Sequence, residues 1–129
     1  MSDTAIRKIT AVLAVEAVEP SLAFWQDRMG FACTVTVPHE DALGFAIVTR
    51  DGTEIMLQSH DSIRADLTHA GEIPGRSTAL FIEVADLDAI TVTLGDYPIA
   101  LPRRSTFYGM HEIGVVEPGG HFVVFAQQA

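Results

Sequence analysis

The sequence predicts an α+β fold built from two tandem modules, each with the order strand, helix, strand, strand, strand. Two apolar runs flank a Gly-Gly dipeptide in residues 108–126, and residues 44–59 show the same pattern around Asp51-Gly52. Both patterns are typical of a β-hairpin, because Gly-Gly and Asp-Gly accept the positive φ values of a tight turn. Each half of the chain therefore ends in a hairpin.

The second observation is the internal repeat. An apolar strand at residues 9–15 leads into a helix-like segment, and so does the strand at residues 79–84. Aligning the ends of these strands also brings Gly52 within one residue of Gly120, which indicates tandem supersecondary units. We therefore expect a single domain over residues 1–129, with a first βαβββ module at 6–59, a linker at 60–77 and a second βαβββ module at 78–127.

The composition restricts the class of the protein and its partners. A chain of 129 residues with 48% hydrophobic side chains suits one domain in which two small modules share a core. No apolar run approaches the roughly 20 residues that cross a bilayer, and no apolar region typical of an export signal follows the amino terminus. We therefore expect a cytoplasmic protein without a membrane partner. The formal charge of −9 disfavours nucleic acid and favours cations.

A first helix is predicted over residues 19–29. Proline near its start lacks only a donor that would be unpaired anyway, and a glycine follows its end. Leu22, Trp25 and Met29 recur at helical spacing, so this face should pack against the sheet. Residues 31–37 alternate in polarity and stop before a proline, which predicts the second strand.

The second half is predicted in the same way. The linker should contain a short helical turn around residues 63–67. Asp86 is a good N-cap for a helix over residues 87–94, because its carboxylate can accept hydrogen bonds from the first free backbone N–H groups. Residues 99–101 are expected to form a brief strand and residues 102–106 a basic loop.

Three stretches resemble the vicinal oxygen chelate superfamily, which groups glyoxalase I, extradiol dioxygenases and the fosfomycin and bleomycin resistance proteins. They are VLAVEAVEPSLAFWQDRMGF, DGTEIMLQ and YGMHEIGVVEPGGHFVVF, and AFWQDRMGF is most similar to the bleomycin-resistance branch. The resemblance implies a glyoxalase-like fold, in which two βαβββ modules curl a mixed sheet into a cup for a small ligand. It also implies a homodimer, which in some members exchanges the amino-terminal strand.

Enzymes of this superfamily hold a divalent metal in the cup, on side chains from the first and last strand of each module. Matched strand by strand, the resemblance places these ligands at Thr10, Met56, Ala79 and Val124. None of the four carries the imidazole or carboxylate that such metals need. We therefore expect no metal and no other cofactor. A slip of two residues keeps the strand face and gives an alternative donor set of Glu54, Gln58 and Glu83.

Alternation along the strands predicts a mostly apolar cup, with His111 on the same face as Val124 across the last hairpin. The predicted interior is Val12, Ala14, Phe45, Ile47, Glu54, Met56, Gln58, Phe81, Glu83, His111, Ile113, Val115, Phe122 and Val124. Apolar walls with a few polar groups suit a small organic ligand, and Phe107 and Tyr108 could stack on a planar one. The expected ligand-binding residues are Phe45, Met56, Gln58, Phe81, Glu83, Phe107, Tyr108 and His111.

Three functions follow from this cup. The leading hypothesis is metal-independent binding of a small aromatic molecule, neutral or cationic, for sequestration of a drug or toxic metabolite as in antibiotic resistance. Glu83 is the expected anchor, and Arg103 or Arg104 is the alternative for an anionic ligand. The second hypothesis is a lyase, isomerase or dioxygenase-type enzyme in which Glu83 or His111 is the catalytic acid or base. The third is a subunit with a vestigial cup that assembles with another protein.

Overall fold

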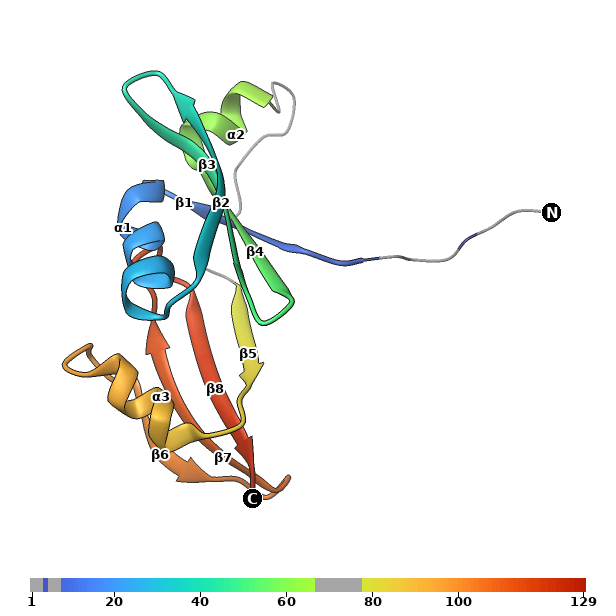
Figure 1. Cartoon of the computed structure of the whole chain (residues 1–129), viewed down its shortest axis with the longest axis vertical. Helices are drawn as coiled ribbons and strands as arrows, with labels where there is room; N and C mark the ends of the chain where they lie inside the picture. Colours follow the sequence, from blue (N-terminus) through green and yellow to red (C-terminus); the bar gives the residue numbers. More distant parts are fainter. Residues whose placement is uncertain (1–3, 5–7, 67–77) are drawn as a thin grey trace.

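The computed structural model describes residues 4, 8–66 and 78–129, and it has the predicted order of elements in both modules. The first module contains β1 (Ala11–Val15), α1 (Val18–Ala23), the π-helical turn η1 (Phe24–Arg28), β2 (Ala32–His39), β3 (Ala42–Arg50) and β4 (Thr53–Ser59). After α2 (His60–Asp66), the second contains β5 (Ala79–Glu83), α3 (Leu87–Leu94), β6 (Leu101–Ser105), β7 (Met110–Val116) and β8 (Phe122–Gln128). Figure 1 shows these elements in sequence colours.

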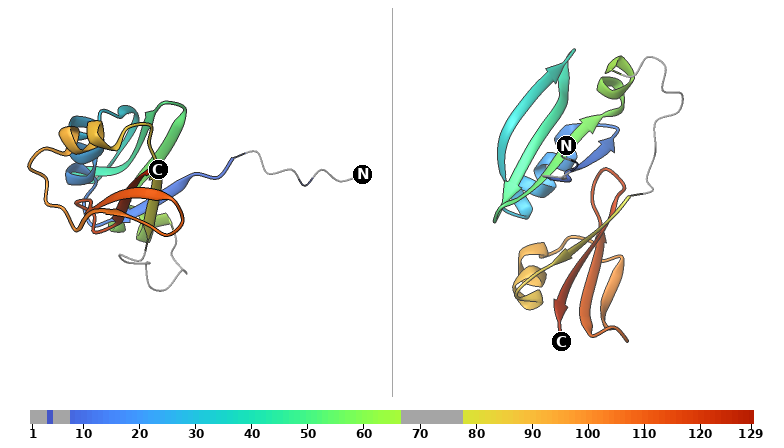
Figure 2. Two further views of the ribbon diagram at one scale, coloured as in Figure 1. Left: turned by 90° about the horizontal axis from the view of Figure 1, so that it is seen from below. Right: turned by 90° about the vertical axis from the view of Figure 1, so that its right-hand side faces the viewer.

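Each module folds its strands into one mixed four-stranded sheet, with the orders β1-β4-β3-β2 and β5-β8-β7-β6. In each sheet the first strand runs parallel to the last, and the other neighbours are antiparallel. The modules follow one another along the long axis, and α1 and α3 lie on the same side of the two sheets (Figures 1 and 2). This is the predicted α+β fold of two βαβββ modules. None of the described helices is long and apolar enough to span a membrane.

A single core joins the modules under α1 and α3. Trp25 is fully buried in it, and its ring meets Phe24 and Phe31 edge-on at centroid distances of 5.1 and 5.2 Å. Leu94 from α3 is part of the same core, and Arg28 Nη1 donates a 2.6 Å hydrogen bond to the Leu94 carbonyl. The expectation that two small modules share their apolar interior agrees with this packing.

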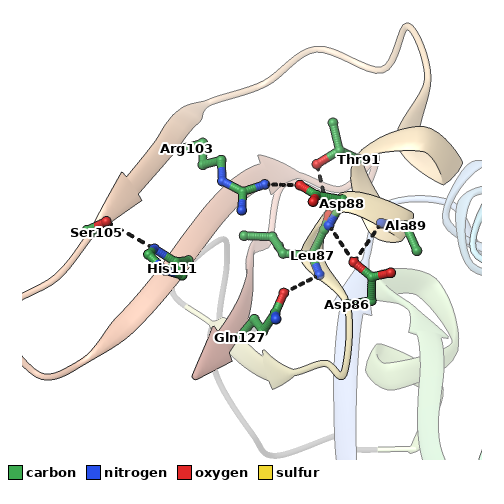
Figure 3. Close-up of polar contacts among 9 residues, drawn as sticks. All are labelled: Asp86, Leu87, Asp88, Ala89, Thr91, Arg103, Ser105, His111 and Gln127. Carbon is green, nitrogen blue, oxygen red and sulfur yellow. Dashed lines mark hydrogen bonds and ion pairs between the residues drawn. The ribbon is translucent and has the colours of Figure 1, made fainter. Parts of the chain in front are cut away.

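The helix ends follow the sequence signals closely. The Asp86 carboxylate accepts hydrogen bonds from the backbone N–H of Asp88 at 3.1 Å and of Ala89 at 3.3 Å, which confirms the predicted N-cap (Figure 3). Gly30 has a φ of 75° after the first helix, as a glycine there should. The helical turn in the linker starts earlier than predicted, because α2 begins at His60. The remainder of the linker, residues 67–77, lies outside the described residues.

Two predicted strand boundaries are wrong, and both errors involve prolines. β2 runs through Pro38, and β6 includes Pro102 together with residues predicted to form a basic loop. Both are edge strands, where a missing N–H can point away from the sheet. The pairing shifts register beside each proline, between Val37 and Pro38 and between Leu101 and Arg104. Such irregularities let an edge strand absorb a residue that cannot pair.

The last hairpin has a longer turn than predicted. The backbone N–H of Glu117 donates to the His121 carbonyl at 2.9 Å, and the N–H of Gly120 donates to the Glu117 carbonyl at 2.8 Å. Gly120 has a φ of 89°. A tight turn followed by a positive-φ residue is the usual three-residue hairpin loop. Residues 118–120 therefore form the turn, in place of the two glycines alone.

This extra residue reverses the predicted faces of β7. Gly114 lies opposite Val124, whereas a two-residue turn would place Val115 there. Because side chains alternate along a strand, a register change of one residue moves each of them to the other face. His111, Ile113 and Val115 therefore lie on the α3 side of the sheet, and their predicted place in the cup is wrong.

Candidate functional site

The candidate site is the cup face, which we define as the faces of the two sheets turned away from α1 and α3. In the first module, Met56 pairs with both Val12 and Ile47, so these side chains share this face as predicted. Leu13 and Leu57, on the opposite face, are fully buried. The cup face of the first sheet carries Val12, Ala14, Phe45, Ile47, Met56 and Gln58.

The second module supplies the other half of the cup face. Val124 pairs with Phe81 on one side and with Gly114 on the other. The predicted orientation of Phe81 and Val124 agrees with this register. The cup face of the second sheet carries Phe81, Glu83, Glu112, Gly114, Val116, Phe122 and Val124.

Much of this apolar surface is open in the single chain. Val12 is 48% exposed, Phe81 is 53% exposed and Val116 is 45% exposed. Large apolar side chains that gather on one exposed surface mark a ligand site or an interface with another protein. The cup face is therefore a candidate site for a ligand or for a partner chain.

The superfamily's metal positions do not fit a metal in this protein. Thr10, Met56, Ala79 and Val124 offer a hydroxyl, a thioether and two hydrocarbon groups, in place of the imidazoles and carboxylates that divalent metals require. In the alternative donor set, Glu54 forms an ion pair with Lys8 and Gln58 Nε2 donates to Ser62 Oγ at 3.1 Å. Within residues 8–66 and 78–129, no three His, Cys, Asp or Glu side chains are grouped as a metal site.

A polar cluster, absent from the sequence prediction, lies on the cup face of the second sheet. Glu112 is only 1% exposed, and both of its carboxylate oxygens are occupied. Arg104 donates to Oε1 through Nε at 3.1 Å and Nη2 at 3.0 Å, and the Tyr108 hydroxyl donates to Oε2 at 2.6 Å. Ionic partners of this kind are needed to bury a carboxylate. We call these three residues the Arg104 cluster.

Two groups of the Arg104 cluster, the Tyr108 hydroxyl and the Arg104 guanidinium, have raised pKa values. The hydrogen bond to Glu112 raises the pKa of Tyr108, because loss of the phenolic proton would place a second negative charge beside the carboxylate. The hydrogen bond from Arg104 to the same carboxylate likewise raises the pKa of the guanidinium. At neutral pH, Tyr108 is therefore a hydrogen-bond donor and Arg104 is a cation.

His111 lies on the other side of this sheet, contrary to the prediction. Its Nδ1 is 3.0 Å from Ser105 Oγ, and it pairs across the hairpin with Gln127, whose Oε1 accepts a hydrogen bond from the backbone N–H of Leu87 in α3 (Figure 3). These contacts are with the helix side of the sheet. His111 therefore does not join the cup face with Phe81 and the other predicted ligand-binding residues.

Glu83 and the two turn aromatics are exposed at the edges of the second sheet. The Glu83 carboxylate has no hydrogen bond or ion pair with another described residue, and Glu83 borders a cavity of about 370 Å³ together with Ala126 and Gln128. Phe107 is fully exposed in the turn between β6 and β7, and its ring meets that of Tyr108 edge-on at 5.1 Å. These positions leave Glu83, Phe107 and Tyr108 accessible to a ligand.

Glu112 is the site residue that sequence reasoning missed. The signal was present in the last hairpin, because Pro118 suits the second position of a tight turn and cannot pair as an inner strand residue. A turn that starts at Pro118 and ends at a positive-φ glycine contains three residues. Counting back from that turn would have placed Glu112 and Gly114 in the cup.

Neither a protein-family model nor a curated protein sequence matches the chain, but solved structures match nearly all of it. A glyoxalase/bleomycin resistance protein/dioxygenase from Nocardioides has 18% identity and a TM-score of 0.70, and the match covers 97% of this chain and 86% of that one. The fold is that of the vicinal oxygen chelate superfamily.

Structures with the vicinal oxygen chelate fold and different activities match this chain about equally well. Lactoylglutathione lyase from Agrobacterium tumefaciens has 15% identity and a TM-score of 0.74, with 98% of this chain and 95% of that chain covered. The bleomycin-binding protein of Streptomyces verticillus, complexed with copper(II)-bleomycin, has 20% identity and a TM-score of 0.68, with 98% and 100% covered. One is an enzyme and the other a binding protein, so the fold alone does not choose between these functions.

Proposed function

We propose that this protein binds a small planar or aromatic organic molecule in its cup, in a homodimer, without a bound metal and without chemical turnover. The observation that carries the proposal is the exposed apolar cup face, on which Val12 and Phe81 are about half exposed. The superfamily's metal positions lack suitable donors, which favours binding over metal-assisted catalysis. A bleomycin-binding protein with a similar fold supports a binding role on a chain of this size.

A homodimer would cover part of the apolar surface that one chain leaves open. We expect sedimentation equilibrium to give a mass twice the 13.9 kDa of one chain, because twofold pairs are the commonest closed assembly and the exposed cup face gives them an apolar surface to bury. Measurement from low to high micromolar concentration gives the dissociation constant. A single species of monomer mass at high micromolar concentration would contradict the dimer.

The binding proposal predicts thermal stabilisation by aromatic compounds. We expect hits from a panel of cationic aromatic drugs, neutral aromatics, thiol conjugates and anionic metabolites, also in the presence of EDTA. A ligand at 100 times its Kd stabilises the native state by about 2.7 kcal/mol. Phe81→Ala should weaken the hits, whereas Val92→Ala, which removes an exposed apolar side chain from α3, should leave them unchanged. The proposal fails if no aromatic compound binds or if EDTA abolishes every hit.

A lyase or isomerase that uses Glu83 as a general base is the second candidate. Glu83 is the carboxylate of the second half-cup that has no protein partner among the described residues, and a lyase shares this fold. His111 no longer supports this candidate, because its ring lies on the α3 side. Mass spectrometry of each hit after incubation separates the two functions. A product that disappears with Glu83→Gln, while binding persists, would favour the enzyme.

A further inference from the structure

We propose that the second half of the cup selects an amphoteric ligand, with a cationic group at Glu83, an anionic group at Arg104 and an aromatic body between them. This inference rests on the proposed binding function and names the chemical class of its ligand. It arises from a polar row that crosses the second sheet on the cup face.

The row is fixed by the strand register. Glu83 pairs with Ala126, Ala126 pairs with Glu112, and Glu112 pairs with Arg104, so the four residues lie side by side on β5, β8, β7 and β6. Neighbouring strands are roughly 4.8 Å apart, which puts the Cα atoms of Glu83 and Glu112, two strands apart, at roughly 10 Å along the row. A carboxylate and a guanidinium thus stand at the two ends of one cross-strand line.

The acidic end of the row is free to accept a hydrogen bond from a ligand. Glu83 is exposed, and its carboxylate has no ion pair or hydrogen bond with any residue that the structure describes. It borders a cavity of about 370 Å³ that is also lined by Ala126 and Gln128 of β8, so there is free space next to Glu83. An ammonium group placed there would meet Glu83 in a charge-assisted hydrogen bond.

At the basic end of the row, Arg104 is already held in place to donate hydrogen bonds to a ligand. The buried Glu112 holds Arg104 through Nε and Nη2, and Tyr108 occupies the other oxygen of Glu112. The Arg104 side chain is still 52% exposed, so N–H groups that Glu112 does not use face solvent. A guanidinium fixed in this way loses less side-chain entropy when it binds a carboxylate. Glu112 is a positioning residue, because it acts on the ligand through Arg104.

An apolar row next to the polar row provides the place for a ring. Phe81, Val124 and Gly114 pair across β5, β8 and β7. Each lies two residues along its strand from the polar row, and therefore on the same face of the sheet. A side chain at Gly114 would have a Cβ only 2.9 Å from the Phe122 ring, so this aromatic side chain packs directly over the glycine. An aromatic body resting on Phe81 and Val124, beside the Phe122 ring, would keep both charged ends in reach.

Three matched compounds test the assignment, and none of them has to be the natural ligand. They are 2-phenylethylammonium, 4-ethylbenzoate and 4-(2-aminoethyl)benzoate, which carry the cation alone, the anion alone and both on one ring. Affinities are measured by calorimetry on the 129-residue chain at low ionic strength, where ionic contacts are least screened. We expect the amphoteric compound to bind at least about 10-fold more tightly than either of the others, a difference of about 1.4 kcal/mol.

Variants on the two faces of β6 provide the control. Arg104→Gln should remove the advantage conferred by the carboxylate, whereas Arg103→Gln changes the same charge on the neighbouring residue, which pairs with Asp88 of α3 (Figure 3). Glu83→Gln should remove the advantage conferred by the ammonium group. Glu112→Gln should weaken the binding of 4-ethylbenzoate and leave the binding of 2-phenylethylammonium unchanged. If Glu112 had only a structural role, the substitution would affect both compounds alike.

The outcomes separate this inference from the proposed function. Equal affinities for the three compounds, no binding by any of them, or equal effects of Arg104→Gln and Arg103→Gln would overturn the amphoteric assignment. Aromatic hits in the broader panel would leave the binding function standing in each of these cases. Absence of hits in that panel would instead remove the binding function itself.

Discussion

Replacing Trp25 with alanine is expected to lower the free energy of unfolding by roughly 3–5 kcal/mol, the usual cost of removing a large aromatic side chain from a core. Trp25 is fully buried and contacts Phe24 and Phe31 edge-on in the core shared by both modules. Such a loss is a large part of the roughly 5–15 kcal/mol that stabilises a typical domain. Urea unfolding followed by circular dichroism measures the change.

Trp25→Phe is the matched control for this prediction. Trp25 Nε1 has no hydrogen-bond partner among the described residues, so phenylalanine removes ring volume without breaking a hydrogen bond. We expect Trp25→Phe to lose less than half as much stability as Trp25→Ala. A loss below about 1 kcal/mol for Trp25→Ala would show that the core does not depend on this ring, because buried large-to-small changes cost more than that.

Replacing Gly119 with alanine should destabilise the protein by about 2–3 kcal/mol, because the added methyl group has no space. A Cβ at this position would lie 2.4 Å from Val15 Cγ1 and 2.5 Å from Glu117 Oε1. Val15 is fully buried in β1 and cannot move aside easily. The turn that carries Gly119 would therefore have to back away from the first module. Thermal unfolding measures the loss.

Gly109→Ala separates this steric effect from backbone strain. Gly109 has a φ of 82°, and a Cβ there meets nothing within 4 Å, so alanine adds strain without a clash. Left-handed backbone costs a non-glycine residue roughly 1–2 kcal/mol. We therefore expect Gly109→Ala to destabilise less than Gly119→Ala. The reverse order would mean that the contact between the last turn and β1 is loose.

The first half of the site could be predicted from the sequence because its turn is unambiguous. Asp51 and Gly52 both have positive φ values, of 51° and 77°, in the two-residue turn that Asp-Gly favours. Arg50 then pairs with Thr53, and alternation from there places Phe45, Met56 and Gln58 on one face.

The second half was predicted less well because its signals compete. The Gly-Gly dipeptide favours a two-residue turn, but Pro118 adds a third residue and reverses the face of each β7 side chain. Pro102 and two arginines made β6 resemble a loop, although an edge strand tolerates all three. The pairing of Arg104 with buried Glu112 depends on both corrections, so local patterns could not reveal it.

The number of residues in the turn at 118–120 determines which β7 side chains line the cup. With three residues in the turn, β7 presents Glu112 and Gly114 to the ligand and directs His111 toward α3. A two-residue turn would bring His111 and Ile113 into the cup and push the carboxylate beneath the helix. Deletion of one residue from the turn would thus replace the Glu112 carboxylate in the cup with the His111 imidazole, although neither residue is mutated. Among proteins of this fold, an insertion or deletion in this hairpin can therefore change the lining of a cup more than any one substitution within it.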